Sequence, residues 1–437
     1  MNNNNNNKYY IFQSLINNVY LRRRIFSAVT VIHRRKNAYN VKRWKQLGLR
    51  DLLCYGYLDE FKQRYTQQGQ KFTEDELEDG IPIAPAMRGH LHCLKYLLEN
   101  HASLFTGEEL EGTCFSGNLQ TVKYLMDNAP GQSTALSLTV AATAGALDVV
   151  KYLHNNVTNL NTRGALDAAA HRGHLNVVKY LHDNNIADGA THVAMDQAAS
   201  GGFLEIVEFL HMNRSEGATT AALDGAASGG HLAVIDFLLT HRQEGGSRAL
   251  EMAVRQCTPT REDYAHRRAV LDRLLAGGFA SPANIALIDI AATSNDAELV
   301  RLLHERGERA TREALNKACR WRNMEMIRFL VENRSEGCSI QTLNESAKVG
   351  DVELIQYLHS RLPSDIRFFI TPNSDLQDQS LYLAATRNHM PVVEFLWTYR
   401  RHECSAQLSK TLEYCQTKNN PIYLYLTNQQ YQQQQQQ

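Results

Sequence analysis

The sequence lacks the features that mark a membrane-spanning or secreted protein. No stretch reaches the roughly 18 uninterrupted apolar residues that a membrane-spanning helix needs, although 43% of its 437 residues are hydrophobic. Six asparagines follow Met1 where a signal peptide would be charged and then apolar. The eight cysteines stand singly, without a C-x-x-C pair, which is typical of reduced thiols. We therefore expect a cytoplasmic protein without a membrane span.

Common catalytic motifs are also absent. The sequence contains no G-x-x-x-x-G-K-[ST], G-x-S-x-G, H-E-x-x-H or kinase-like H-R-D. We therefore expect a protein that is not an enzyme and that has no cofactor, no metal and no small-molecule substrate. An enzyme with an unrecognised site remains a remote alternative.

Acidic residues are missing from one part of the chain. Residues 1–50 contain 11 Lys and Arg and no Asp or Glu, which leaves 35 basic against 46 acidic residues in the remainder, a net charge of −11. A basic head therefore precedes an acidic body. The acidic body favours a basic or mixed protein partner over nucleic acid.

What the sequence does contain is a repeated phrase. "GHLHCLKYLLEN" at 89–100 returns as "GALDVVKYLHNN" at 145–156, "GHLNVVKYLHDN" at 173–184 and "GHLAVIDFLLTH" at 230–241. The central position of this phrase recurs at intervals of 27–30 residues, apart from two intervals of 36 and 38. These twelve marker positions are Tyr96, Tyr124, Tyr152, Tyr180, Phe209, Phe237, Arg273, Leu302, Phe329, Tyr357, Phe395 and Tyr425. "LLCYGYLDEF" at 52–61 suggests a thirteenth copy.

Each copy predicts two short helices. In residues 162–184 a first helix around "GALDAAAHR" is rich in alanine, and Gly173 suits the left-handed residue that ends a helix. A second helix follows with Leu175, Val178 and Leu181 on one face and Lys179 pointing away. Such short helices are unstable alone, so stacking of successive units must bury their faces.

The phrase A-A-x-x-G-H-L-x-V-V-K-Y-L closely resembles the helical half of an ankyrin repeat. The best matches are "AAHRGHLNVVKYL", "AASGGHLAVIDFL" and "AATAGALDVVKYL", and the resemblance covers roughly residues 50–430. The T-P-L-H opening is missing, and the unit is about five residues shorter than the usual 33. The resemblance implies an all-α, ankyrin-like solenoid of stacked antiparallel helix pairs with an N-terminal helical cap and with shortened or absent β-hairpin tips. It also implies a non-enzymatic scaffold or adaptor that binds other proteins.

The chain is expected to have four parts. They are a disordered Asn tract (1–7), a basic helical module (8–50), a repeat array of about 12–13 units (51–428) and a disordered Gln tail (429–437). Three interpretations of residues 8–50 stay open. The segment could cap the first repeat, act as a nuclear or mitochondrial targeting signal, or serve as an adaptor module. "IFSAV" and "VKRWKQL" resemble an F-box without its L-P-x-E opening, which would make the protein a substrate-recognition adaptor of a ubiquitin ligase.

The two stretched intervals are candidates for binding loops. Insertions in solenoids become loops on one face, which is often the binding face. One insertion lies near 255–270 and the other near 361–380. The second contains Arg367, Phe368, Phe369 and Ile370 between two prolines, an apolar cluster suited to anchoring a partner protein. Packing of this cluster into the repeat core is the alternative.

Histidine recurs in several copies, but its spacing argues against a metal site. His90, His174 and His231 follow the turn glycine. Equivalent positions on successive packed helices lie about 8–10 Å apart, whereas zinc–nitrogen bonds are roughly 2 Å long. We therefore expect these histidines to form hydrogen bonds with the loop backbone.

Overall fold

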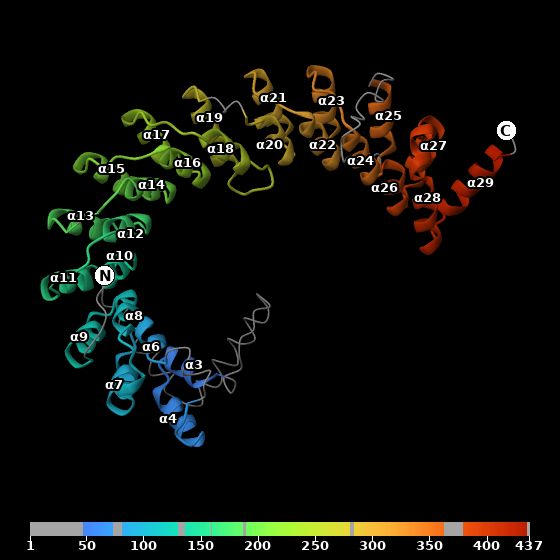
Figure 1. The fold of residues 1–437 in the computed structure, drawn as a ribbon. Coiled ribbons are helices and arrows are strands. Elements are labelled where there is room, and N and C mark those ends of the chain that lie inside the picture. The colour runs from blue at the N-terminus through green and yellow to red at the C-terminus, as the bar shows by residue number, and fades with distance from the viewer. Residues whose placement is uncertain are drawn as a thin grey trace. The chain divides into compact units, whose positions relative to one another are not determined.

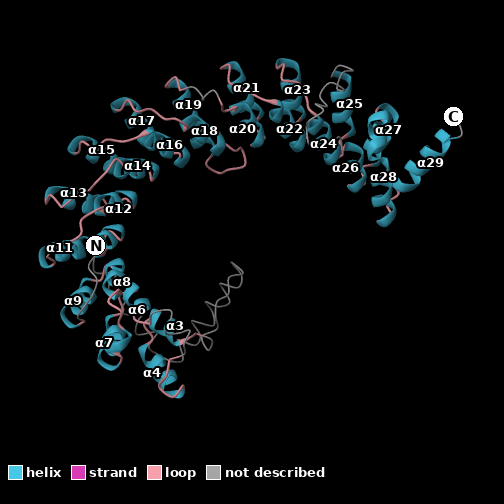
Figure 2. Ribbon diagram, in the orientation of Figure 1, coloured by secondary structure: helices cyan, strands magenta, loops and turns pink. Residues whose placement is uncertain are grey.

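The described part of this chain consists of helices and loops. The computed structural model describes residues 47–72, 81–129, 136–158, 160–186, 189–279, 284–361 and 379–434. Within these ranges there are 26 α-helices and one short 3-10 helix, with no strand (Figure 1, Figure 2). The α-helices form 13 consecutive pairs, so the expectation of an all-α stack of helix pairs without hairpin strands is confirmed. No described helix is long and apolar enough to cross a membrane.

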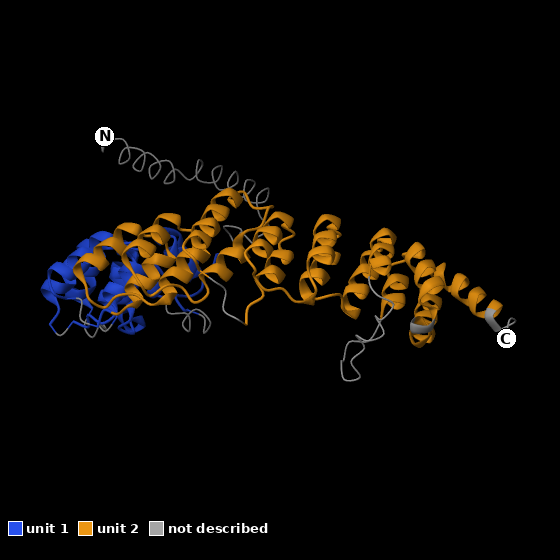
Figure 3. Cartoon of the chain, turned by 90° about the horizontal axis from the view of Figure 1, so that it is seen from above, with its two compact units in different colours: residues 1–190 blue, residues 191–437 orange. Residues whose placement is uncertain are grey.

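The chain divides into two compact units, residues 1–190 and 191–437 (Figure 3). In the first unit, the first helices of the pairs are α3 (Leu49–Cys54), α6 (Ile83–Met87), α8 (Glu109–Ser116), α10 (Ser137–Thr143) and α12 (Ala165–His171). The second helices are α4 (Leu58–Gln67), α7 (Leu91–Asn100), α9 (Leu119–Asn128), α11 (Leu147–Asn156) and α13 (Leu175–Asp183), with the 3-10 helix η2 (Ala102–Leu104) after α7.

The second unit continues the same alternation. Its first helices are α14 (Val193–Ser200), α16 (Thr220–Gly229), α18 (Ala249–Gln256), α20 (Leu287–Thr293), α22 (Arg312–Trp321), α24 (Ile340–Val349), α26 (Ser380–Thr386) and α28 (Arg401–Thr417). Its second helices are α15 (Leu204–Asn213), α17 (Leu232–His241), α19 (Tyr264–Ala276), α21 (Ala297–Glu305), α23 (Met324–Asn333), α25 (Val352–Arg361), α27 (Met390–Tyr399) and α29 (Ile422–Gln434).

Within each unit the helices form two layers. First helices pack against first helices, as α14, α16, α18 and α20 do, and second helices such as α15, α17 and α19 form the other layer (Figure 1). All twelve marker positions lie in second helices. The repeat phrase therefore predicted the helix layer correctly.

The pair α12–α13 shows why these residues form this unit. Ala169 and Ala170 are fully buried, and their small side chains allow neighbouring first helices to approach closely. Gly173 takes a left-handed φ of 79°, which an L side chain adopts only with strain. On α13, Val178 and Leu181 are fully buried while Lys179 is exposed, as the sequence predicted. Burial of such a Leu side chain stabilises by about 1.5–3 kcal/mol.

A carboxylate on the first helix of one pair binds the N-cap residue of the first helix in the next pair. Asp196 on α14 accepts hydrogen bonds from the backbone N–H and hydroxyl of Thr219, at 2.8 and 2.7 Å. Asp289 on α20 makes the same pair with Thr311, at 2.8 and 2.6 Å. Both threonines are the N-caps of their own helices. This contact sets the register of successive first helices because it bonds backbone as well as side chain.

Two expected boundaries differ from the structure, and the first stretched interval is only partly a loop. The helix pair α3–α4 begins at Leu49, so the described array starts two residues before the expected position 51. The expected tail at 429–437 overlaps α29, which continues to Gln434. The first stretched interval becomes both a loop at 257–263 and a longer second helix, α19, of 13 residues. Most of the second insertion and residues 1–46 lie outside the described residues.

Candidate functional site

The turn between the two helices of a pair is the place where one repeat makes hydrogen bonds with the preceding repeat. The Nε2 atom of His174 lies 3.0 Å from the carbonyl oxygen of Thr143, two residues before the turn glycine of the preceding repeat. His90 and His231 make the equivalent contacts with the carbonyls of Cys54 and Ser200, each at 3.1 Å. These carbonyls have no partner within their own helix end. The expectation that these histidines bond loop backbone is therefore confirmed.

A second set of histidines packs against aromatic rings on the second helices. The ring of His304 on α21 meets the ring of Phe329 on α23 edge to face, with centroids 5.2 Å apart. In the first unit, Nδ1 of His154 lies 3.0 Å from the hydroxyl of Tyr180 on the next second helix. In both contacts the aromatic residue at the marker position of one repeat meets a histidine of the preceding repeat. The histidines are thereby engaged in stacking the repeats.

The described cysteine and histidine side chains do not form a reactive centre. Burial raises the pKa of the Cys93 and Cys114 thiols to about 12, and that of Cys257 to about 11. These thiols stay protonated at neutral pH and are therefore poor nucleophiles. In the ranges that the structure covers, no three His, Cys, Asp or Glu side chains gather in a group that could hold a metal ion.

Three loops that leave the second helices share an Arg-x-Glu-Gly sequence, at 214–217, 242–245 and 334–337. In each loop the arginine donates to the glutamate two residues later, with Nε-to-carboxylate distances of 3.0–3.1 Å. These hydrogen bonds lower the pKa of Glu216, Glu244 and Glu336 below the usual value of 4.5. The loop glycines have left-handed φ angles of 74°, 66° and 72°. At these three places a tight turn held by an ion pair thus stands where a shortened or absent β-hairpin tip was expected.

Two of these arginines also reach the preceding repeat. Nη1 of Arg334 lies 3.1 Å from Nδ1 of His304, and Nη1 of Arg242 lies 3.4 Å from Nδ1 of His211. Guanidinium nitrogens only donate, so Nδ1 of each histidine is the acceptor in this contact. The loops at 242–245 and 334–337 are therefore held by their internal ion pair and by a contact with the preceding repeat.

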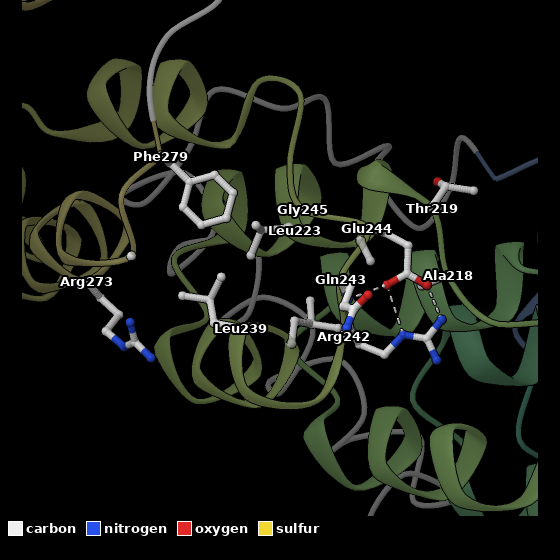
Figure 4. A pocket seen from close by; sticks show the side chains of 13 residues that line it. Ala218, Thr219, Leu223, Leu239, Arg242, Gln243, Glu244, Gly245, Arg273 and Phe279 are labelled. Atoms are coloured by element: carbon white, nitrogen blue, oxygen red, sulfur yellow. Dashed lines mark hydrogen bonds and ion pairs between the residues drawn. The ribbon is translucent and has the colours of Figure 1, made fainter.

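One such loop forms the wall of a pocket of about 250 Å³ in the second unit (Figure 4). The apolar part of the lining includes Leu223 on α16, Leu238 and Leu239 on α17, and Phe279 after α19. Charged and amide groups supply the rest, from Arg242, Gln243, Glu244 and Arg273. Arg273 is held in place by an ion pair with Asp236 on α17, at 2.5 Å between Nε and Oδ1. The pocket combines an apolar lining with charged groups.

The same pocket recurs 92 residues later with a volume of about 80 Å³. Its lining residues Thr311, Ala314, Leu315, Leu330, Arg334 and Glu336 replace Thr219, Ala222, Leu223, Leu238, Arg242 and Glu244. Among the described residues, Arg361 also lines the smaller pocket, and the position equivalent to Phe279 lies outside the described residues. The repeating architecture thus provides a pocket at the same place in two repeats.

The candidate residues expected from the sequence are not among the described residues. Arg367, Phe368, Phe369 and Ile370 fall within 362–378, outside the described residues, so their role as partner anchors stays a prediction. The pocket residues Arg242, Glu244 and Phe279 were missed. The identical "NRSEG" sequences at 213–217 and 333–337 are a signal in the sequence that points to two of the Arg-x-Glu-Gly loops.

Comparison with known proteins agrees with this architecture. A family model described as ankyrin repeats (3 copies) matches residues 110–196. No curated protein matches the chain. Among solved structures, the crystal structure of the human ASB11 ankyrin repeat domain is similar at 21% sequence identity and a TM-score of 0.34, covering 46% of this chain and 99% of that chain. The chain thus contains ankyrin repeats at residues 110–196, and the helix pairs and left-handed turns of this segment recur before and after it.

Proposed function

We propose that this chain is a non-enzymatic scaffold that binds another protein through the surface of its repeats. Ankyrin repeats are in general protein–protein interaction modules, and the family match supports this role. The observation that carries the proposal is the pocket beside the 242–245 loop, where an apolar lining meets charged groups from Arg242, Glu244 and Arg273. Apolar anchors surrounded by polar groups are typical of protein interfaces.

The size of the pocket favours a protein side chain over a small molecule. Pockets that enclose small-molecule ligands usually measure about 300–1,000 Å³, and this pocket is smaller, at about 250 Å³. A volume of this size suits an aromatic or aliphatic side chain that projects from a partner. The pocket thus supports binding of a protein.

The chemistry of the described residues supports a role without catalysis. The histidines after the turn glycines are engaged with backbone carbonyls, and the buried thiols are protonated at neutral pH. A cytoplasmic location is part of the proposal, since all eight cysteines are free and seven of them are buried.

Two further elements of the proposal stay predictions. Arg367, Phe368, Phe369 and Ile370 are expected to add an aromatic anchor for the partner. The alternative role as a substrate-recognition adaptor of a ubiquitin ligase depends on residues 8–50, of which only 47–50 are described.

Affinity capture with the full chain tests the scaffold function. We expect specific proteins, identified by mass spectrometry, to bind the wild-type chain and to be lost when Leu239 and Phe279 are both replaced by alanine. A matched control replaces Leu98 and Met126, two half-buried residues on α7 and α9, by alanine. Capture that survives the pocket variant as well as the control would contradict the use of the pocket. Ubiquitin-ligase subunits among the bound proteins would favour the alternative role.

A further inference from the structure

Three consecutive residues at the C-terminal end of α22 expose large side chains. The side chains of Arg320 and Arg322 are 50% and 60% exposed, and Trp321 is 53% exposed. Tryptophan and arginine are the side chains that most often dominate protein interfaces. We refer to Arg320, Trp321 and Arg322 as the Arg-Trp-Arg surface.

Arg322 occupies a backbone position that disfavours arginine. Its φ of 55° is left-handed, and it lies at the turn between the two helices of its pair. Among the turns that the structure describes, twelve have a left-handed residue here. Eight of these are glycine, three are asparagine, and arginine occurs only at 322. A strained conformation that persists where glycine would avoid the strain is a reason to look for function.

The following repeat orients both arginines. Nε and Nη2 of Arg320 donate to Glu345 on α24, at 3.1 and 2.9 Å. The same two nitrogens of Arg322 donate to Asp351 at the start of α25, at 3.0 and 2.9 Å. The side chains of Glu345 and Asp351 are only 5% and 13% exposed. Because each pair uses Nε and Nη2, the two N–H groups of each Nη1 lie outside the pair.

Trp321 is oriented by the preceding repeat. Its indole Nε1 donates to the carbonyl oxygen of Thr293 at the end of α20, at 3.0 Å. This is the carbonyl position that His174 and His231 satisfy in other repeats. Here the histidine position is taken by Asn323, which caps its own helix. The contact to Thr293 is thus made by a residue whose ring stays half exposed.

The charge around this surface favours an anionic ligand. Lys317 on α22 and Lys348 on α24 lie on the same helices as the arginine and glutamate of the first pair. Lys348 interacts electrostatically with Glu345, and Glu313 on α22 interacts with Arg320, so charges of both signs lie near the two ion pairs. The carboxylates of Glu345 and Asp351 are largely buried while both arginines are at least half exposed, so the exposed charge of these two pairs is cationic.

We propose that the Arg-Trp-Arg surface binds an acidic peptide segment of a partner protein, with the carboxylates on the arginines and an apolar side chain on the Trp321 ring. This inference rests on the proposed function and specifies the chemistry of the partner. Carboxylates accept from guanidinium N–H groups, and the charge-assisted hydrogen bond is stronger than a neutral one. Side chains already held by Glu345, Asp351 and Thr293 lose little freedom on binding, which favours affinity.

A peptide-binding assay with the full chain tests this inference. The probe is a fluorescent peptide of about seven Asp and Glu residues with leucine at its centre, roughly 20–25 Å long when extended. The comparison probes are a peptide with every acid replaced by lysine and a single-stranded oligonucleotide of similar length. We expect the acidic peptide to bind, and Trp321→Ala to weaken it roughly tenfold or more. The lysine peptide and the oligonucleotide are expected to bind less tightly.

Arg322→Gly separates binding from folding. Glycine removes the backbone strain, so the thermal midpoint should be kept or raised while the affinity for the acidic peptide falls roughly tenfold. The matched control is Arg301→Ala, which removes an exposed arginine paired with Glu325 and should leave binding unchanged.

Three results would overturn the inference. They are equal peptide affinity in wild-type, Trp321→Ala and Arg322→Gly chains, tighter binding of the lysine peptide, and tighter binding of the oligonucleotide. If partner proteins are still captured while the acidic peptide does not bind, this inference fails and the scaffold function stands.

Discussion

The imidazole of His174 lies directly against the backbone of Gly145 in the preceding repeat. A methyl group built on Gly145 would come within 2.5 Å of Nδ1 of His174. The φ of Gly145 is also left-handed, at 72°. The turn glycine therefore serves two purposes, since it relieves backbone strain and leaves room for the ring that satisfies the carbonyl of Thr143.

Gly145→Ala should destabilise more than Gly164→Ala. Both glycines have a φ of 72°, but nothing lies within 4 Å of the Cβ position of Gly164. Gly164→Ala should cost about 1–2 kcal/mol from backbone strain alone. Gly145→Ala should cost a further 1–3 kcal/mol or so because His174 must move. Denaturant unfolding of the two variants measures both costs, and equal costs would show that the ring does not constrain the turn.

Acidification should weaken the repeat that contains His231. Burial lowers the pKa of His231 below 6.5, and the nearby Arg267 and His266 lower it further, against the opposing hydrogen bond to Ser200. The unfolded chain therefore binds the proton more readily than the folded chain. The stability contributed by neutral His231 is complete above pH 6.5 and is lost as the pH falls through the folded pKa.

Thermal unfolding across this pH window, combined with an NMR titration of the imidazole, checks the effect. His231→Gln should reduce the pH dependence of the midpoint. The control, His192→Gln, changes an exposed histidine and should leave the dependence unchanged. A His231 pKa at or above 6.5 would contradict the prediction.

Leu181→Ala and Lys179→Ala should separate the buried and exposed faces of α13. Leu181 is fully buried, so its truncation should cost about 2–5 kcal/mol. Lys179 is exposed, and its truncation should change stability by no more than about 0.5 kcal/mol. A denaturant series on both variants measures the difference. Similar losses would show that the helix faces are assigned wrongly.

Replacing both Phe368 and Phe369 by alanine should weaken partner binding while the helical array stays folded. Truncation removes the aromatic anchors that commonly dominate interface energy. The measurement is the affinity for a captured partner together with far-UV circular dichroism. Full affinity would make the segment a simple connection between repeats. Unfolding of the last repeats would place both rings in the core.

Much of the fold could be predicted because it follows from local rules. The inward position of Leu181 follows from the helical period, and the turn at Gly173 follows from the need for a left-handed residue. The structural role of the histidines followed from the distance between repeats. The candidate site was predicted less well, because the pocket combines residues from 218 to 279 on several helices and loops.

The sequence by itself determined the repeat, its helix pairs and the faces that are buried, since these depend on residues within about one unit. Only the tertiary structure decided which partners each side chain meets in the next repeat. His174 bonds Thr143, 31 residues earlier, and Arg242 contacts His211 over the same separation. Arg322 is joined to Asp351 across 29 residues. These pairs exist because stacking brings equivalent positions of successive units together, and no local periodicity specifies which atoms then come within hydrogen-bond distance.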